Sequence, residues 1–194
     1  SLGLITTAAA KCFVGPHAAR ALVARGYAVA AINYRFSQDA VFPAQIEDCQ
    51  RAIRWLRAHA REYGLDPARL GAWGGSAGGH TALSLAGGRW SDAQFLRHCD
   101  AHLEEDFSSC VGFVTRLRGN LWDPIKKAVA MGVLRQRFAD PTWHTHHDPR
   151  VAAALAAVPF AADFDMASLA TPRIPLGLAT ADGDINQVPR FHSQ

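Results

Sequence analysis

The chain has 194 residues, of which 49% are hydrophobic and 19% charged, and its formal net charge is +3 at pH 7. These values are typical of a globular protein with one core, so we expect a single domain over residues 1–194. No basic stripe with interleaved aromatics and no apolar run near the roughly 20 residues of a membrane span occurs, so neither nucleic acid nor membrane is an expected partner. The first ten residues lack the basic start of a signal peptide, so a cytoplasmic location is expected, with secretion or a periplasmic location left open.

Helix and strand patterns alternate over the first 63 residues. Residues 16–25 predict a short helix that ends at Gly26, because glycine accepts the left-handed conformation common after helices. Tyr27 to Asn33 is a continuous apolar run, typical of a strand in a sheet that is covered on both faces. From Pro43 to Tyr63 apolar residues recur every three or four positions, which predicts an amphipathic helix.

Residues 70–86 contain the most informative motif, a Gly-x-Ser-x-Gly sequence between an apolar strand and a helix-forming run. This arrangement predicts a nucleophile elbow, in which Ser76 sits on a turn so tight that small residues, here Gly74 and Gly78, must flank it. Such a turn exposes the serine hydroxyl and places the Ala77 N–H at a helix N-terminus, where it can stabilise an oxyanion. The alternative is an ordinary glycine-rich loop.

Further elements follow to the end of the chain. Ser91 with Gln94 three residues later is a capping-box start for a helix to about Leu103, and Asp123-Pro124 opens another helix. The last elements are a strand over 151–158, a helix over 164–170 and a strand over 174–180. This alternation predicts an α/β fold with a doubly wound, mostly parallel sheet.

A serine nucleophile needs a base, which an acid orients. Asp182 and Asp184 follow the last predicted strand, where doubly wound sheets gather their sites, and either can be the acid. His192 is the candidate base, by folding back toward Asp184 or by reaching a second chain. His80, one helical turn after Ser76, is expected to pack the helix against the sheet.

The remaining cysteines and histidines suggest no cofactor. Four cysteines are too few for a disulfide framework in this length, although Cys99 and Cys110 are close enough in sequence to bridge a loop in a secreted protein. Adjacent loop histidines are usually solvated, and structural zinc sites need four fixed ligands, so no metal is expected. The cluster concerned is His144, His146, His147 and Asp148.

Strings on the two sides of the elbow resemble two branches of the α/β-hydrolase fold. The first half resembles the feruloyl-esterase and hormone-sensitive-lipase-like branch, and the second half resembles the predicted dienelactone hydrolases. The resemblance implies a reduced α/β-hydrolase fold and a serine esterase, and the change of branch near residues 76–88 predicts a chimeric gene. The strings are Arg25–Val29, Ile32–Arg35, Phe42–Asp48, Tyr63–Pro67 and Trp73–His80 for the first branch, and Thr81–Gly87, Phe95–Cys99, Ile174–Leu178 and Asp182–Asp184 for the second.

Departures from the family pattern lead to a further expectation. The first branch has a His-Gly-Gly oxyanion motif on an early strand, and Gly3-Leu4-Ile5 does not contain it. The early strand before Pro16 is expected to be missing. In both branches the catalytic histidine would follow the last residue, Gln194. Truncation of this kind would leave an open sheet edge, which predicts a homo-oligomer, such as an intertwined dimer that delivers a histidine to the neighbour's Ser76.

The predicted function is therefore hydrolysis of small carboxylic esters through an acyl-enzyme on Ser76. The alternative is a truncated or chimeric hydrolase-derived scaffold with little or no turnover.

Overall fold

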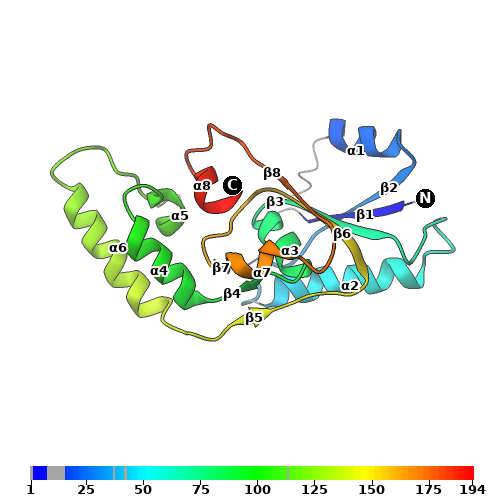
Figure 1. The fold of residues 1–194 in the computed structure, drawn as a ribbon, viewed down its shortest axis with the longest axis horizontal. Helices are drawn as coiled ribbons and strands as arrows, with labels where there is room; N and C mark the ends of the chain where they lie inside the picture. The colour runs from blue at the N-terminus through cyan, green and yellow to red at the C-terminus, as the bar shows by residue number, and fades with distance from the viewer. Residues whose placement is uncertain (1, 8–15, 37, 42, 113) are drawn as a thin grey trace.

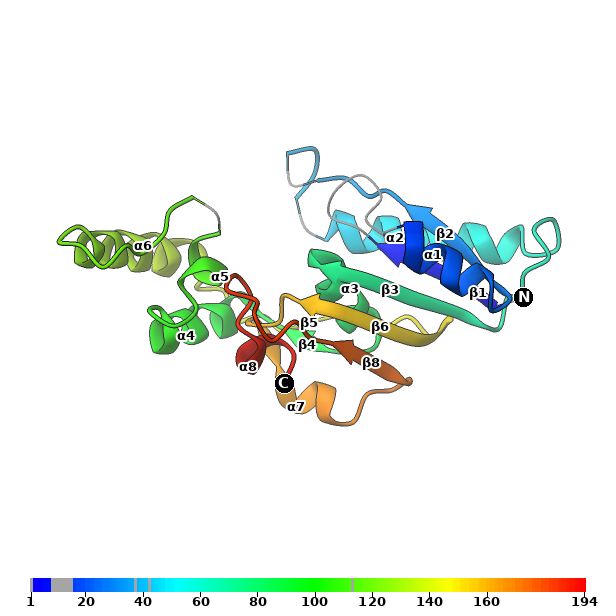
Figure 2. The ribbon, with the colours of Figure 1, turned by 90° about the horizontal axis from the view of Figure 1, so that it is seen from above.

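A computed structural model describes residues 2–7, 16–36, 38–41, 43–112 and 114–194. At its centre lies a five-stranded sheet in the order β2-β1-β3-β6-β8, with every neighbouring pair parallel (Figure 1). Helix α1 lies on one face of this sheet and helices α2 and α3 lie on the other (Figures 1 and 2), so the predicted doubly wound α/β architecture is confirmed. The elements are β1 (Leu2–Thr7), β2 (Tyr27–Ile32), β3 (Leu70–Ser76), β6 (Val151–Pro159), β8 (Leu176–Ala179), α1 (Pro16–Val23), α2 (Ala44–Ala58) and α3 (Ala77–Leu85).

Strand β1 corrects the expectation that no strand precedes Pro16. It pairs in parallel with β2 on one side, where Leu4 faces Val29, and with β3 on the other, where Leu4 faces Gly71. The strand is only six residues long, so its sequence signal is weak. Pairing on both sides stabilises it through contacts far along the chain, which local pattern does not reveal.

The core between the sheet and helix α2 follows from the predicted periodicity. Ile46, Ile53 and Leu56 of α2 pack against Leu70 of β3 and Val151 of β6. The helix ends at Ala58 rather than at Tyr63, and the chain then turns to Gly64, whose φ of +64° is the left-handed conformation that glycine accepts.

Three helices form a lobe beyond the carboxyl ends of the strands (Figures 1 and 2). They are α4 (Asp92–His102), α5 (Phe107–Val111) and α6 (Asp123–Arg137). The predicted cap of α4 is present, since the Gln94 N–H donates to Ser91 Oγ at 3.1 Å. A disulfide joins Cys99 of α4 to Cys110 of α5, so the structure resolves the state that the sequence left open.

A small antiparallel sheet connects the lobe to the main sheet. It consists of β5 (His144–Thr145), β4 (Arg89–Trp90) and β7 (Phe164–Asp165), in that order. Because β7 takes two residues of the predicted helix over 164–170, α7 covers only Met166–Ala170. The chain closes with α8 (Pro189–His192), and within the described residues no helix is long and apolar enough to cross a membrane.

Candidate active site

Ser76 occupies the turn between β3 and α3 in the strained conformation of a nucleophile elbow. Its φ is +54° and its ψ is −119°, a region that residues other than glycine rarely adopt. The side chain is exposed, while Gly74 and Gly78 on either side are buried. Ala77 is the first residue of α3, so its N–H belongs to the positive end of the helix dipole.

Close packing of α3 on β6 holds this turn in place. A Cβ on Gly79 would lie 2.7 Å from Pro159 Cα, so only glycine fits at this crossing. The Phe160 N–H donates to the Ser76 carbonyl at 3.3 Å, which extends the contact between β3 and β6 past the ends of the strands. Val158 has a φ of +38°, so a second strained residue lies beside the elbow.

The loop after β8 reaches the nucleophile. Gln187 Nε2 donates to Ser76 Oγ at 3.1 Å, across 111 residues of sequence. Asp184, a candidate acid, accepts the backbone N–H groups of Asn186 and Gln187 through Oδ1 at 2.8 and 3.0 Å. Asp182, the other candidate, is exposed. Gln187 stands in no recognised motif, so the sequence does not indicate it as a site residue.

The structure places His192, the candidate base, in a buried cluster with partners other than Ser76. Its Nε2 lies 2.9 Å from Asp106 Oδ2 and 3.0 Å from Ser109 Oγ, while its Nδ1 accepts the Ala161 N–H at 3.0 Å. Because Nδ1 accepts a hydrogen bond, the ring proton is on Nε2 and donates to Asp106. Both ring nitrogens are thus engaged within the same chain, which does not fit delivery of His192 to a neighbour's Ser76.

Asp106 is the centre of that cluster, and its side chain is fully buried. His98 Nε2 also lies 2.8 Å from Asp106 Oδ2. Burial on its own raises the pKa of this carboxyl, but the hydrogen bonds from His192 and His98 outweigh it and lower the pKa to about 2. The cluster joins α4, the start of α5 and α8.

His80 packs α3 against the small antiparallel sheet and against Phe160, which follows β6, rather than against the strands of the main sheet as expected. Its ring contacts Trp90, Phe160 and Phe164, and its Nε2 lies 2.8 Å from Asp163 Oδ2. His80 and Asp163 line a cavity of about 280 Å³, which is also lined by Ala77, the first residue of α3. The lining residues are Tyr34, Gln45, Ile46, Ala77, His80, Thr81, Phe160 and Asp163.

The rings of His144 and His146 stack on Trp90 and on one another, while His147 and Asp148 make separate contacts. His144 stacks on Trp90, His147 Nδ1 lies 3.1 Å from the Leu85 carbonyl, and Asp148 forms an ion pair with Arg150. Across the described parts of the chain, no three His, Cys, Asp or Glu side chains come together closely enough to hold a metal ion.

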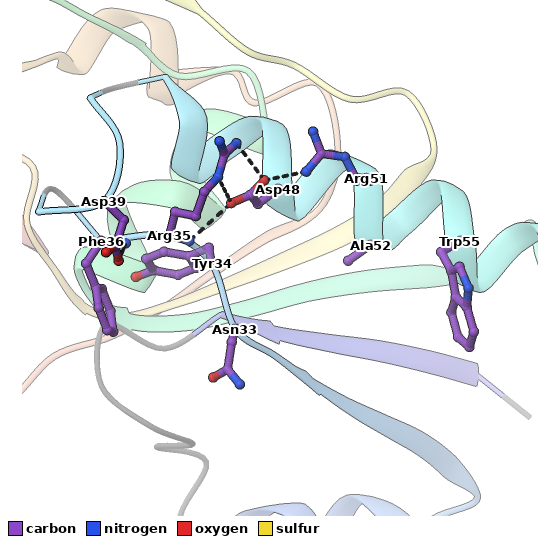
Figure 3. Close-up of a pocket in the computed structure, with 9 residues that line it drawn as sticks. All are labelled: Asn33, Tyr34, Arg35, Phe36, Asp39, Asp48, Arg51, Ala52 and Trp55. Carbon is purple, nitrogen blue, oxygen red and sulfur yellow. Dashed lines mark hydrogen bonds and ion pairs between the residues drawn. The ribbon is translucent and has the colours of Figure 1, made fainter.

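A second cavity, of about 670 Å³, lies between the end of β2 and α2 (Figure 3). Arg35 Nε and Nη2 donate to the two oxygens of Asp48 at 2.8 and 2.9 Å, and Arg51 donates to the same carboxylate at 2.6 Å. The hydrogen bond from Arg35 lowers the pKa of Asp48 to about 2. Both arginines are paired with this one carboxylate, which fixes the loop after β2 on the helix.

Comparison with known proteins identifies the family to which the chain is similar. Residues 7–115 match the model of the BD-FAE family, a segment that includes the elbow. Over 70 residues the chain is 46% identical to a probable carboxylic ester hydrolase, LipM, of Mycobacterium tuberculosis, covering 36% of this chain and 16% of that protein. Over 60 residues it is 45% identical to arylacetamide deacetylase of Oryctolagus cuniculus, covering 30% of this chain and 15% of that protein.

A solved structure of the esterase Est22 is also similar. It shares 18% sequence identity with a TM-score of 0.45, covering 82% of this chain and 36% of that one. The chain thus spans well under two thirds of the proteins that it matches. The family match covers more than half of the chain, and the chain belongs to the BD-FAE family.

Proposed function

We propose that this protein is a serine esterase that cleaves small carboxylic esters through an acyl-enzyme on Ser76. The observation that supports this most strongly is the elbow itself: an exposed serine at a φ of +54°, between a parallel strand and the start of a helix. A strained serine of this kind is retained where the hydroxyl must face a substrate. The relatives named as ester hydrolases point to the same chemistry.

The proposed reaction has two steps. Ser76 Oγ attacks the ester carbonyl as its proton passes to an imidazole base, the Ala77 N–H stabilises the oxyanion, and the alcohol leaves with a proton returned by the imidazole. Water then attacks the acyl-enzyme in the same way and releases the acid. His192, with Asp182 or Asp184 as the acid, is the sequence-based candidate for the base, and it would have to leave Asp106 to serve Ser76.

An activity-based probe tests the proposal. A fluorophosphonate labels only an activated serine, so the wild type should be labelled and Ser76→Ala should not. The same substitution should abolish hydrolysis of a short p-nitrophenyl ester while changing the free energy of unfolding by less than about 1 kcal/mol, because the side chain is exposed. Hydrolysis retained by Ser76→Ala would contradict the assignment, and an unlabelled wild type would favour the scaffold without turnover.

The substrate panel should include a dienelactone. The family match ends at residue 115, whereas the resemblance to dienelactone hydrolases rests on strings between residues 81 and 184. Turnover of the dienelactone alone would support the second branch and with it the chimeric origin, and turnover of simple esters alone would favour the first branch.

We also propose that the protein forms a homodimer. Strand β8 is the outermost strand of the described sheet on its side, three of its four residues are exposed, and Leu178 is 49% exposed. An uncovered edge with apolar side chains is suited to pairing with a second copy. Light scattering over a dilution series measures the mass, and a stable 21.0 kDa species at micromolar concentration would contradict the dimer.

A further inference from the structure

The Ser76 hydroxyl has a side-chain partner that is neither an acid nor a base. Gln187 Nε2 donates a hydrogen bond to Ser76 Oγ at 3.1 Å. A carboxamide cannot remove the hydroxyl proton, but its N–H carries a fixed positive partial charge directed at the reacting oxygen. The contact therefore suits stabilisation of negative charge rather than proton transfer.

We propose that Gln187 is a catalytic residue that stabilises the charge developing on Ser76 Oγ as it attacks the ester, with Asp184 as the residue that positions it. The inference rests on the proposed function. As the Oγ proton passes to the imidazole base, negative charge builds up on Oγ, and the amide N–H already points at this oxygen. An Oγ electron pair then forms the bond to the carbonyl carbon while the C=O π pair moves to the carbonyl oxygen, whose charge the Ala77 N–H stabilises. Gln187 exchanges no proton and is unchanged by the reaction.

A fixed dipole contributes to catalysis only if it is held in place before the reaction. Asp184 Oδ1 supplies this by accepting the N–H groups of Asn186 and Gln187 at 2.8 and 3.0 Å, which folds the backbone into a tight turn. Ser109 Oγ donates to the Asn186 carbonyl at 2.7 Å, and so ties the turn to α5.

The chain on the far side of Gln187 is fixed as well. Two residues beyond it, α8 begins, and this helix ends at the buried His192. The turn that carries Gln187 is thus held by part-buried hydrogen bonds to Asp184 and Ser109, and the helix that follows it ends at a buried residue.

This geometry assigns Asp184 a task different from that of a triad acid. Its Oδ1 is used by backbone N–H groups, an interaction that an asparagine side-chain oxygen can make equally well. A triad acid, in contrast, must carry a negative charge to stabilise an imidazolium, and asparagine cannot replace it.

Four variants of the full chain test the proposal, with the fluorophosphonate labelling rate and kcat for a p-nitrophenyl ester as readouts. Gln187→Ala should lower both rates about 10²- to 10³-fold, in line with the loss of one preorganised donor, with KM little changed. Gln187→Glu should lose at least as much near neutral pH, because a carboxylate would repel the developing charge. Its deficit relative to the wild type at the same pH should shrink at acidic pH, where the carboxyl is protonated. Asp184→Asn should stay within about threefold of the wild type, whereas Asp184→Ala should fall at least tenfold through loss of the turn.

Melting temperatures of all four variants distinguish a loss of catalytic rate from unfolding. Gln187 and Asp184 lie in a loop, so the variants are expected to fold. If the wild type is labelled and Gln187→Ala is labelled at the same rate or faster, the inference is overturned. The proposed function then remains intact. Asp184→Asn as slow as Asp184→Ala would return Asp184 to the role of triad acid. A wild type that does not label refutes the proposed function and, with it, the catalytic role of Gln187.

Discussion

Replacement of Asp106 by asparagine should destabilise the protein strongly for a single-atom change. The carboxylate is fully buried and binds the Nε2 atoms of His98 and His192 at 2.8 and 2.9 Å. Asparagine keeps the shape of the side chain but removes the negative charge that strengthens both hydrogen bonds.

The pKa of Asp106 gives the size of the expected loss of stability in Asp106→Asn. It is lowered from its ordinary value of 3.8 to about 2, so the folded state favours the carboxylate by about 2 kcal/mol at neutral pH. Because the folded pKa is below the unfolded one, this stabilisation is complete above pH of about 4 and is lost as the pH falls through about 2. At pH of about 3 roughly half of it remains.

Urea unfolding at pH 7 and at pH 3 measures the effect. Asp106→Asn should lose about 2 kcal/mol at pH 7, or roughly 4–8 °C in Tm, and about half as much at pH 3. The control is Asp100→Asn on the neighbouring helix α4, where the ion pair with Arg135 is exposed and the loss should stay within about 0.5 kcal/mol. If Asp106→Asn is no less stable than Asp100→Asn at pH 7, the buried cluster does not stabilise the fold as argued.

Two further predictions concern packing and the disulfide. Gly79→Ala should lower the free energy of unfolding by about 1–3 kcal/mol, because its Cβ would lie 2.7 Å from the Pro159 backbone. Its control, Gly132→Ala in α6, should raise the free energy of unfolding by about 0.5–1 kcal/mol, since nothing lies within 4 Å of the added methyl group. Thermal melts measure both, and an unchanged Tm for Gly79→Ala would contradict the close crossing of α3 and β6. Replacing Cys99 and Cys110 together by serine should remove about 3 kcal/mol, as expected for a closed loop of this size. Urea unfolding with and without a reductant checks this, and a wild type insensitive to reductant would speak against the bond.

The nucleophile elbow was predictable from sequence because every constraint on it is local. The glycines, the strand before Ser76 and the helix after it lie within about 15 residues, and the structure shows the strained turn that this pattern predicts. The partner of Ser76 was not predictable, since Gln187 is 111 residues away in a loop without regular periodicity. The buried cluster at Asp106 was hidden for the same reason, as His192 lies 86 residues from it. A histidine in sequence suggests a base, and the contacts of His192 with Asp106 and Ala161 are visible only once α8 is packed.

The position of β1 has a consequence for how the chain folds during synthesis. The strand is made before both of its neighbours, β2 at residues 27–32 and β3 at residues 70–76. Until β3 has left the ribosome, β1 has an unpaired edge, and contacts of such large sequence separation form slowly. An unpaired apolar strand is also where nascent chains associate with one another. Refolding yield should therefore fall steeply with protein concentration, and a chaperone that binds short apolar segments should restore it.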